Sequence, residues 1–171
     1  ASNLFTLEVE DLVAVRDVVT LLQRTEIVAR IAEEIERYLV ELGADGRLVE
    51  LQLRELMAGV EDDRRLVVLD YFQPDASWNL EQAMETLSDL EMEELLDTEA
   101  VAEALHLSGG AKDTDGSLSP RGHRMLAKVP RLPEAIATNV VERFGTLDRL
   151  LRASAADLAA VDGVGDTWAS T

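Results

Sequence analysis

The residues best suited to bind an anion lie near the end of the chain, in the stretch Val161-Asp-Gly-Val-Gly165. Glycine adopts positive φ angles and lets a second backbone come close. Because backbone amides at the start of a helix form an anion site, we expect the amides of Gly163, Val164 and Gly165 to contact a phosphate. This spacing is typical of a helix-hairpin-helix motif, which binds the DNA backbone. A Gly-x-Gly alone also fits a plain turn between two helices, and that alternative stays open.

A second stretch of the same kind precedes the first, at Val129-Pro-Arg-Leu-Pro133. A helix is predicted directly after it, over residues 134–144, and Pro133 suits the first position of that helix. Two short helices are expected to follow, with N-caps at Thr146 and Ser154. The two turns together predict a tandem pair of helix-hairpin-helix units.

Charge divides the chain into two unequal parts. The net charge of −18 argues against nucleic-acid binding by the whole chain, because phosphate contacts depend on Lys and Arg. However, residues 1–120 hold 9 basic and 28 acidic residues, whereas residues 121–171 hold 7 and 6. We expect only this second part to contact DNA, with the backbone amide of Leu132 among the contacts. The basic residues expected to support phosphate binding there are Arg121, Arg124, Lys128 and Arg131.

Other kinds of chemistry lack the residues that they need. The chain has no cysteine, and its two histidines, His106 and His123, have no partner at metal-ligand spacing. We expect both histidines at the surface or at an interface. The turn around Gly116 lacks the first and last ligands of a calcium loop, and no nucleophile motif or P-loop is present. We therefore expect no catalytic residue, no metal site and no cofactor in this chain.

Hydropathy and periodicity together predict an all-α protein. No apolar run reaches the ~20 residues that span a membrane, so we expect a cytoplasmic protein without membrane contact. Apolar residues recur at three- to five-residue steps over residues 7–42, which indicates a long amphipathic helix that Gly43 ends and that serves a bundle or a subunit interface. Further helices are predicted over residues 47–58, closed by Gly59, and over residues 64–72, 80–87, 91–96 and 98–107.

Turn-forming residues over 108–119 mark the best boundary in the chain. We predict an elongated helical linker, or spine, over residues 1–110, a loop over 111–118, and a small tandem helix-hairpin-helix domain over 119–171. The last domain is expected to be truncated at its C-terminus, because the sequence stops inside the helix that should follow Gly165.

Three stretches of the chain resemble a known family. Ser119-Pro-Arg-Gly-His-Arg-Met-Leu-Ala-Lys-Val-Pro-Arg-Leu-Pro133 is similar to the segment that leads into the helix-hairpin-helix domain of the DNA integrity scanning family, DisA. Upstream, residues 42–53 and 59–63 resemble the helical linker of the same family. The stretches follow one another in the family's order, so the resemblance spans nearly the whole chain.

The resemblance implies a protein of three parts. The first is a diadenylate cyclase domain, which makes cyclic di-AMP from two ATP and uses a divalent metal; the others are a helical spine and a C-terminal domain that recognises branched DNA. It also implies a homo-oligomer, an octamer in the family. The cyclase motifs are absent here, so we expect this chain by itself not to be an enzyme. Two departures are His123, where a tyrosine is expected, and Trp168, near an expected arginine.

We therefore expect the chain to bind the DNA backbone without reading its sequence, with a preference for branched or junction DNA. In this interpretation it is the sensing part of a DNA-integrity-scanning diadenylate cyclase. The alternative is a helical scaffold for oligomerisation or protein interaction, in which the helix-hairpin-helix tip is purely structural. Phosphate binding should weaken steeply with salt, whereas an apolar helix interface should not, so salt dependence separates the two.

Overall fold

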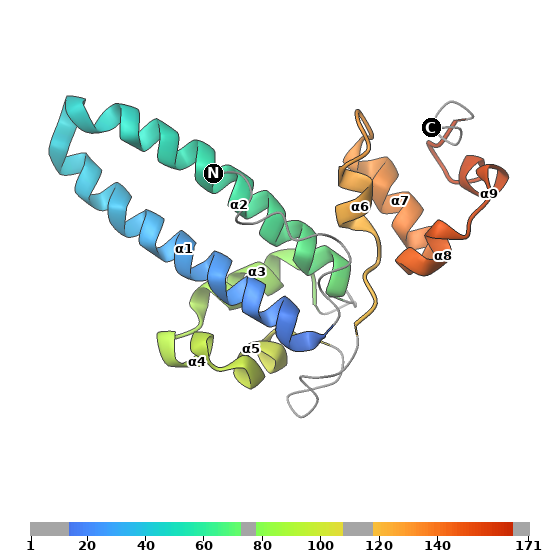
Figure 1. Cartoon of the computed structure of the whole chain (residues 1–171), viewed down its shortest axis with the longest axis horizontal. Coiled ribbons are helices and arrows are strands. Elements are labelled where there is room, and N and C mark those ends of the chain that lie inside the picture. Colours follow the sequence, from blue (N-terminus) through green and yellow to red (C-terminus); the bar gives the residue numbers. More distant parts are fainter. Residues whose placement is uncertain (1–13, 73–77, 108–117, 166–171) are drawn as a thin grey trace.

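The computed structural model describes residues 14–72, 78–107 and 118–165, and every regular element in these ranges is a helix. The prediction of an all-α fold is confirmed. Figure 1 shows an elongated molecule, in which a long helical hairpin runs to one side and a smaller group of helices forms a tip at the other. Within the described ranges, no helix combines the length and the hydrophobicity needed to cross a membrane.

Helix α1 (Val15–Leu42) is the first arm of the hairpin. Its start is set by Ala14, whose backbone is extended and whose N–H donates to the carboxylate of Asp17 over 3.0 Å. The helix was predicted to begin at residue 7; residues 7–13 lie outside the described part of the chain. The apolar face near its start is buried and includes Val15, Val18 and Leu22.

Helix α2 (Arg47–Tyr71) is the second arm, joined to α1 by the short 3₁₀ helix η3 (Gly43–Gly46). The sequence predicted two helices here, separated at Gly59, and that prediction is wrong. Gly59 lies inside one continuous helix, on an open surface. A glycine within a helix costs only about 1 kcal/mol, whereas Val60 and Val67 just beyond it are buried. Packing therefore keeps the helix continuous.

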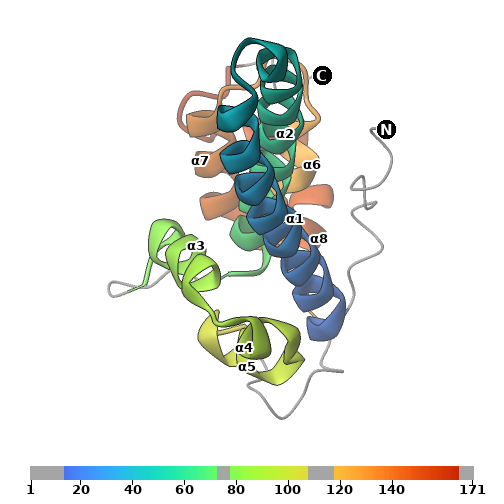
Figure 2. The ribbon, with the colours of Figure 1, turned by 90° about the vertical axis from the view of Figure 1, so that its left-hand side faces the viewer.

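Helices α3 (Leu80–Asp89), α4 (Met92–Leu96) and α5 (Thr98–Ala104) pack beside the base of the hairpin (Figure 2). The cap predicted at Asn79 is confirmed, because its side-chain oxygen accepts from the N–H of Gln82 over 3.0 Å. Helix α5 ends three residues before the predicted end, since the backbone turns left-handed at His106, with φ 51°. The His106 ring stacks on Trp78 at 4.6 Å between centroids.

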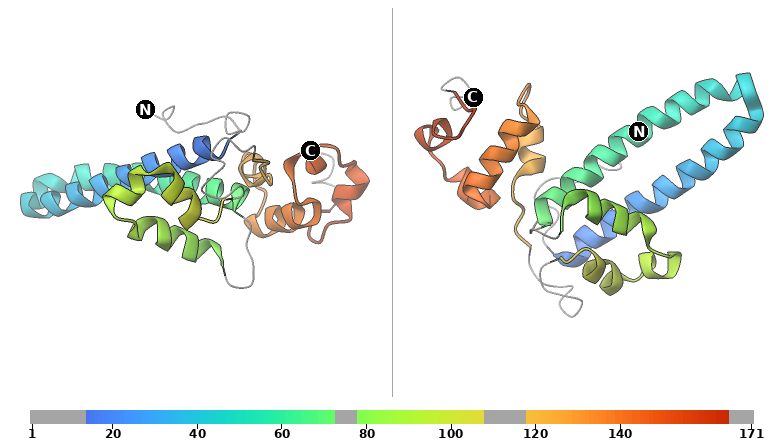
Figure 3. Two further views of the ribbon diagram at one scale, coloured as in Figure 1. Left: turned by 90° about the horizontal axis from the view of Figure 1, so that it is seen from below. Right: turned by 180° about the vertical axis from the view of Figure 1, so that it is seen from behind.

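The tip contains helices α6 (His123–Ala127), α7 (Glu134–Phe144), α8 (Leu147–Leu151) and α9 (Ala155–Ala159), shown from two further sides in Figure 3. The bounds predicted for α7 are confirmed, and so are the caps at Thr146 and Ser154, whose hydroxyls accept backbone N–H groups of α8 and α9. Pro133 was predicted to be the first helical residue of α7, but it is the N-cap of that helix.

The described residues form two hydrophobic cores. One joins the base of the α1–α2 hairpin to α3 and α5 and reaches Leu118. The other belongs to the tip alone and is built around Leu126, Val141, Leu150 and Val164. Most of the loop predicted over residues 111–118 lies outside the described part of the chain.

Candidate nucleic-acid interface

The two predicted hairpins share one backbone geometry. In the first, the N–H of Leu132 donates to the carbonyl of Val129 over 3.3 Å; in the second, the N–H of Val164 donates to Val161 over 3.0 Å. The third residue of each turn has a positive φ, 64° at Arg131 and 87° at Gly163. A four-residue turn with positive φ at its third position is the form that favours glycine. Thus both turns follow the same chain path, although only the second has glycine at that position.

The first hairpin leads into α7 through a helix start that no side chain caps. Pro133, its N-cap, makes no side-chain hydrogen bond to the first turn. The amides at the start of a helix need an external acceptor, and an anion is well placed to supply it. The side chains of Lys128 and Arg131 are exposed beside this helix start, while the carboxylate of Glu134 pairs with Arg65 of α2 over 2.8 Å.

Apolar side chains hold both hairpins in place from the inner side. Val161 and Val164 are buried in the core of the tip, and Val129 and Leu132 pack against the same core. The side-chain amide of Asn139, on α7, donates to the carbonyl of Asp162 over 3.1 Å and fastens the second hairpin to that helix. Asn139 was not predicted as a site residue, because no local pattern in the sequence relates two residues 23 positions apart.

The two glycines of the second hairpin have different surroundings. A Cβ at Gly163 would lie 3.2 Å from Cγ1 of Ile136 and would require the positive φ of 87°, whereas a Cβ at Gly165 would meet nothing within 4 Å. We expect Gly163→Ala to destabilise the tip by about 1–2 kcal/mol, the cost of a left-handed non-glycine residue.

The matched variant Gly165→Ala should leave the stability within about 0.5 kcal/mol. Chemical denaturation followed by circular dichroism measures both differences. An equal loss in the two variants would contradict the assignment of turn geometry to Gly163.

The four predicted cations have unequal positions. Lys128 and Arg131 are exposed. Arg121 is half-buried, and its backbone N–H donates to the backbone carbonyl of Asp70 over 3.0 Å. Arg124 is buried, and its guanidinium binds the carboxylate of Asp70 over 3.0 Å and the hydroxyl of Tyr71 over 2.8 Å. Since that guanidinium is engaged inside the protein, Arg124 does not belong among the residues that can reach a phosphate.

His123 is also buried, where α6 contacts α2 within the chain, so the surface position expected for it is wrong. Burial lowers the pKa of its imidazole, an effect that outweighs the opposing attraction of Asp70. The imidazole of His123 is therefore protonated less readily in the folded protein than in the unfolded chain.

We expect the contribution of neutral His123 to the stability of the fold to be fully present above the ordinary histidine pKa of about 6.5. This contribution should be lost as the pH falls below that value. Thermal melting between neutral and mildly acidic pH measures this loss. The variant His123→Gln should lack that part of the pH dependence. If its melting profile followed the same curve as the parent's, another group would be responsible.

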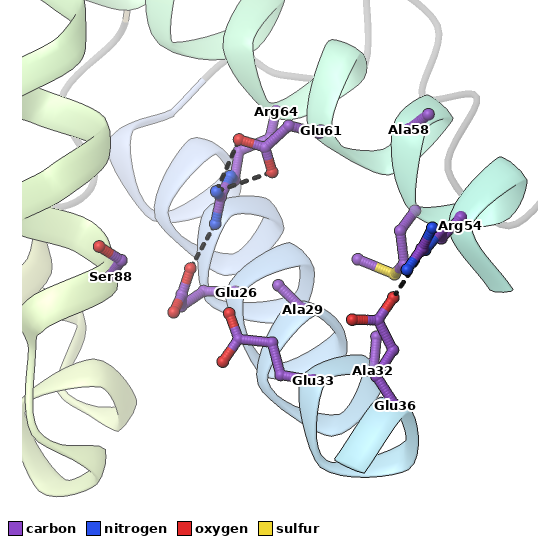
Figure 4. A pocket seen from close by; sticks show the side chains of 11 residues that line it. Glu26, Ala29, Ala32, Glu33, Glu36, Arg54, Ala58, Glu61, Arg64 and Ser88 are labelled. Carbon is purple, nitrogen blue, oxygen red and sulfur yellow. Dashed lines mark hydrogen bonds and ion pairs between the residues drawn. The ribbon is translucent and has the colours of Figure 1, made fainter. Parts of the chain in front are cut away.

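A cavity of about 480 Å³ lies between α1 and α2 (Figure 4), and no residue of the two turns of the tip lines it. On its wall the buried carboxylate of Glu26 binds the guanidinium of Arg64, which also binds Glu61 over 2.8 Å. Glu26 further accepts from Arg30, and Arg30 donates to the carbonyl of Leu90 after α3. This network, which no local sequence pattern predicts, joins α1, α2 and the residue after α3.

Among the residues that the structure describes, no group of three or more histidine, aspartate or glutamate side chains is arranged to hold a metal ion. Several carboxylates that line the acidic cavity between α1 and α2 pair with arginines: Glu36 lies 3.8 Å from Arg54, which also pairs with Glu50. Because the Arg54 side chain is 63% exposed, its pairs contribute little to the stability of the α1–α2 hairpin.

The fold and the two turns define a class: a helical linker, built on a long hairpin, joined to a helical tip with two equivalent turns after α6 and α9. The helix expected after Gly165, with Trp168, lies outside the described residues. The family described as the DisA bacterial checkpoint controller linker region matches residues 1–114. The chain therefore belongs to the DisA family.

Relatives extend the similarity across the whole chain. The chain is 52% identical over 170 residues to the DNA integrity scanning protein DisA of Parafrankia sp. (strain EAN1pec), covering 99% of this chain and 47% of that protein. It is 54% identical over 172 residues to the protein of the same name from Streptomyces griseus, and this match covers 99% of this chain and 46% of that protein. The chain thus spans about half the length of the curated relatives that it matches.

Proposed function

We infer that the tip binds the DNA backbone through its two hairpins. The observation that supports this most is their common geometry, with the same turn hydrogen bond and the same positive φ at Arg131 and Gly163. Two equivalent amide-rich turns suit phosphates on two strands. The proposed contacts are the side chains of Lys128 and Arg131 and the backbone amides of Leu132, Gly163, Val164 and Gly165, with Arg121 as electrostatic support.

The mechanism needs no contact with base edges. Amides and cations that bind phosphates position a protein on DNA but carry no sequence information. Discrimination would come from the shape of the DNA, since two turns on one rigid core accept only certain spacings of phosphates. Branched or junction DNA, which offers phosphates in unusual relative positions, is the proposed preferred target.

The relatives' name and length support the proposal that this activity belongs to a longer protein. These relatives are named DNA integrity scanning protein DisA, and the chain matches about half the length of each. We propose that the chain is the sensing part of a diadenylate cyclase, with a homo-oligomer as its working form and with cytoplasmic localisation. The chemistry that needs ATP and a divalent metal would then belong to the other half, and this half would contribute none of the catalytic groups.

A fluorescence anisotropy titration of the chain with a four-way junction and with a matched duplex, each at low and moderate salt, tests this proposal. Binding that favours the junction and weakens as salt rises is expected, because phosphate contacts release counterions. The absence of binding to both DNAs at low salt would sink the proposal for this chain.

A specific observation favours the second candidate, a scaffold that self-associates. Four large apolar side chains of α1, at least 39% exposed, follow one another at helical spacing: Ile31, Ile35, Tyr38 and Leu42. This exposed stripe lies on a different face of α1 from Glu33 and Glu36, which line the acidic cavity. A stripe of this kind is the form in which helices pack against one another, and a second copy of the hairpin is the proposed occupant.

We expect Ile35→Glu combined with Tyr38→Glu to abolish self-association of the chain in sedimentation velocity. The matched control is Val40→Glu, because Val40 is 79% exposed but lies roughly 200° around the helix from Tyr38. Two acidic hairpins repel each other, and salt screens that repulsion. Self-association should therefore strengthen with salt, whereas DNA binding should weaken. A monomer at every salt concentration would contradict the scaffold.

A further inference from the structure

Asp70, in the last turn of α2, has a fully buried carboxylate at the contact between the α1–α2 hairpin and the tip. A buried carboxylate is tolerated only when hydrogen bonds and a counter-charge replace water. Its carboxylate accepts hydrogen bonds from a segment more than fifty positions further along the chain.

The first set of partners is the N-terminus of α6. One carboxylate oxygen of Asp70 accepts from the N–H groups of Gly122 and His123 over 2.9 and 2.5 Å, and the other accepts from that of Arg124 over 3.2 Å. Helix α6 has no cap of its own, because its N-cap residue is Gly122. The carboxylate of α2 therefore takes the place of the missing cap, where a negative charge also suits the helix dipole.

The second partner is the guanidinium of Arg124, with its Nε 3.0 Å from the carboxylate. The same guanidinium donates to the hydroxyl of Tyr71, the next residue of α2, and lies 5.4 Å from the centre of its ring. Burial raises the pKa of this hydroxyl to about 12, so it remains neutral. The charge of Asp70 is thus balanced by one cation, held on α2 by two neighbouring side chains.

Besides the backbone bond from Arg121 to the carbonyl of Asp70, the described residues form a second side-chain ion pair between the α1–α2 hairpin and the tip, and it is of a different kind. Arg65 and Glu134 form an ion pair whose side chains are 47% and 67% exposed, and pairs this exposed contribute little to stability. Beneath this pair lies a cavity of about 290 Å³, lined from α2 by Leu66 and Leu69 and from the tip by Leu126 and other residues. Apolar packing between the two parts is therefore incomplete at this point.

We propose that Asp70 is the positioning residue of the tip: it fixes the orientation of the tandem hairpins relative to the linker, so that α2 and the tip turn as one body. The two hydrophobic cores stand on either side of this contact, and the Asp70 carboxylate joins them. A force on the two turns of the tip, at Arg131 and Gly163, would then reach α2 through the carboxylate of Asp70. That consequence rests on the proposed DNA binding, whereas the orientation itself does not.

The chain has no cysteine, which allows spin labels to be attached at chosen pairs of positions. Distances from double electron–electron resonance are measured without DNA in two labelled proteins, Glu55→Cys with Ala156→Cys, across the contact, and Glu142→Cys with Ala156→Cys, within the tip. All of these side chains are exposed. The parent should give a single narrow distance distribution across the contact.

Asp70→Ala should abolish that narrow peak and leave the distribution within the tip unchanged. Asp70→Asn, which keeps one oxygen acceptor but loses the charge, should broaden the peak less. Glu134→Gln, which removes only the exposed pair, should leave it intact and serves as the control.

Three results would overturn the proposal: an unchanged peak in both Asp70 variants, a broad distribution already in the parent, or equal broadening by Glu134→Gln. A tip that loses its internal distance in both Asp70 variants would also overturn it, since Asp70 would then be required for folding and not for orientation. Because no DNA is present, failure here is distinct from failure of the proposed DNA binding.

Discussion

The double variant Lys128→Ala/Arg131→Ala should bind DNA roughly ten- to a hundredfold more weakly at moderate salt, because each phosphate contact contributes about 0.9 to the logarithmic salt slope. Both side chains are exposed: Lys128 directly precedes the turn held by the bond from Leu132 to Val129, and Arg131 is the third residue of that turn. Anisotropy titrations across a range of salt concentrations measure the affinity and the slope together, and the slope should fall by about 2.

Arg131 allows the charge to be separated from the turn. Its φ of 64° suits glycine better than any other residue, so Arg131→Gly should remove the cation and relax the turn. We expect Arg131→Gly and Arg131→Ala to lose similar affinity, since the cation is the missing group in both.

The control is Arg47→Ala, which removes an exposed cation at the far end of α2, next to η3. It should leave both affinity and slope unchanged. If Arg47→Ala weakened binding as much as the hairpin variants, the effect would come from total charge, and the first hairpin would not be the site.

Glu26→Ala should lower the free energy of unfolding by about 3–5 kcal/mol, the cost of leaving a buried charge without its partner. Glu26 is 3% exposed and binds both Arg64 and Arg30. Arg64 would keep only its pair with Glu61, whose side chain is 51% exposed. Urea unfolding followed by circular dichroism measures this loss.

Glu33→Ala is the matched control, because Glu33 is an exposed glutamate of the same helix that lines the same cavity. Its effect should stay within about 0.5 kcal/mol. Comparable losses for the two glutamates would mean that the cavity as a whole, and not the buried ion pair, stabilises the hairpin.

The sequence by itself determined the features that depend on neighbouring residues. Periodicity predicted helices, and the caps at Asn79, Thr146 and Ser154 were predicted because a cap acts within three residues. The equivalence of the two hairpins was visible for the same reason, since a turn is a local structure. The sequence failed at Gly59, where a local helix-breaking tendency was weaker than the packing of the α1–α2 hairpin.

Only the tertiary structure decided which charged residues are available to a partner. Arg124 and Lys128 are both basic residues close to the first hairpin, yet the first is buried against Asp70 and the second is exposed. The bonds that make this difference join residues 54 positions apart, and no local pattern encodes them. The same holds for Glu26 and Arg64, which pair across 38 positions. Buried charges find their partners through packing, so their roles follow from the folded chain alone.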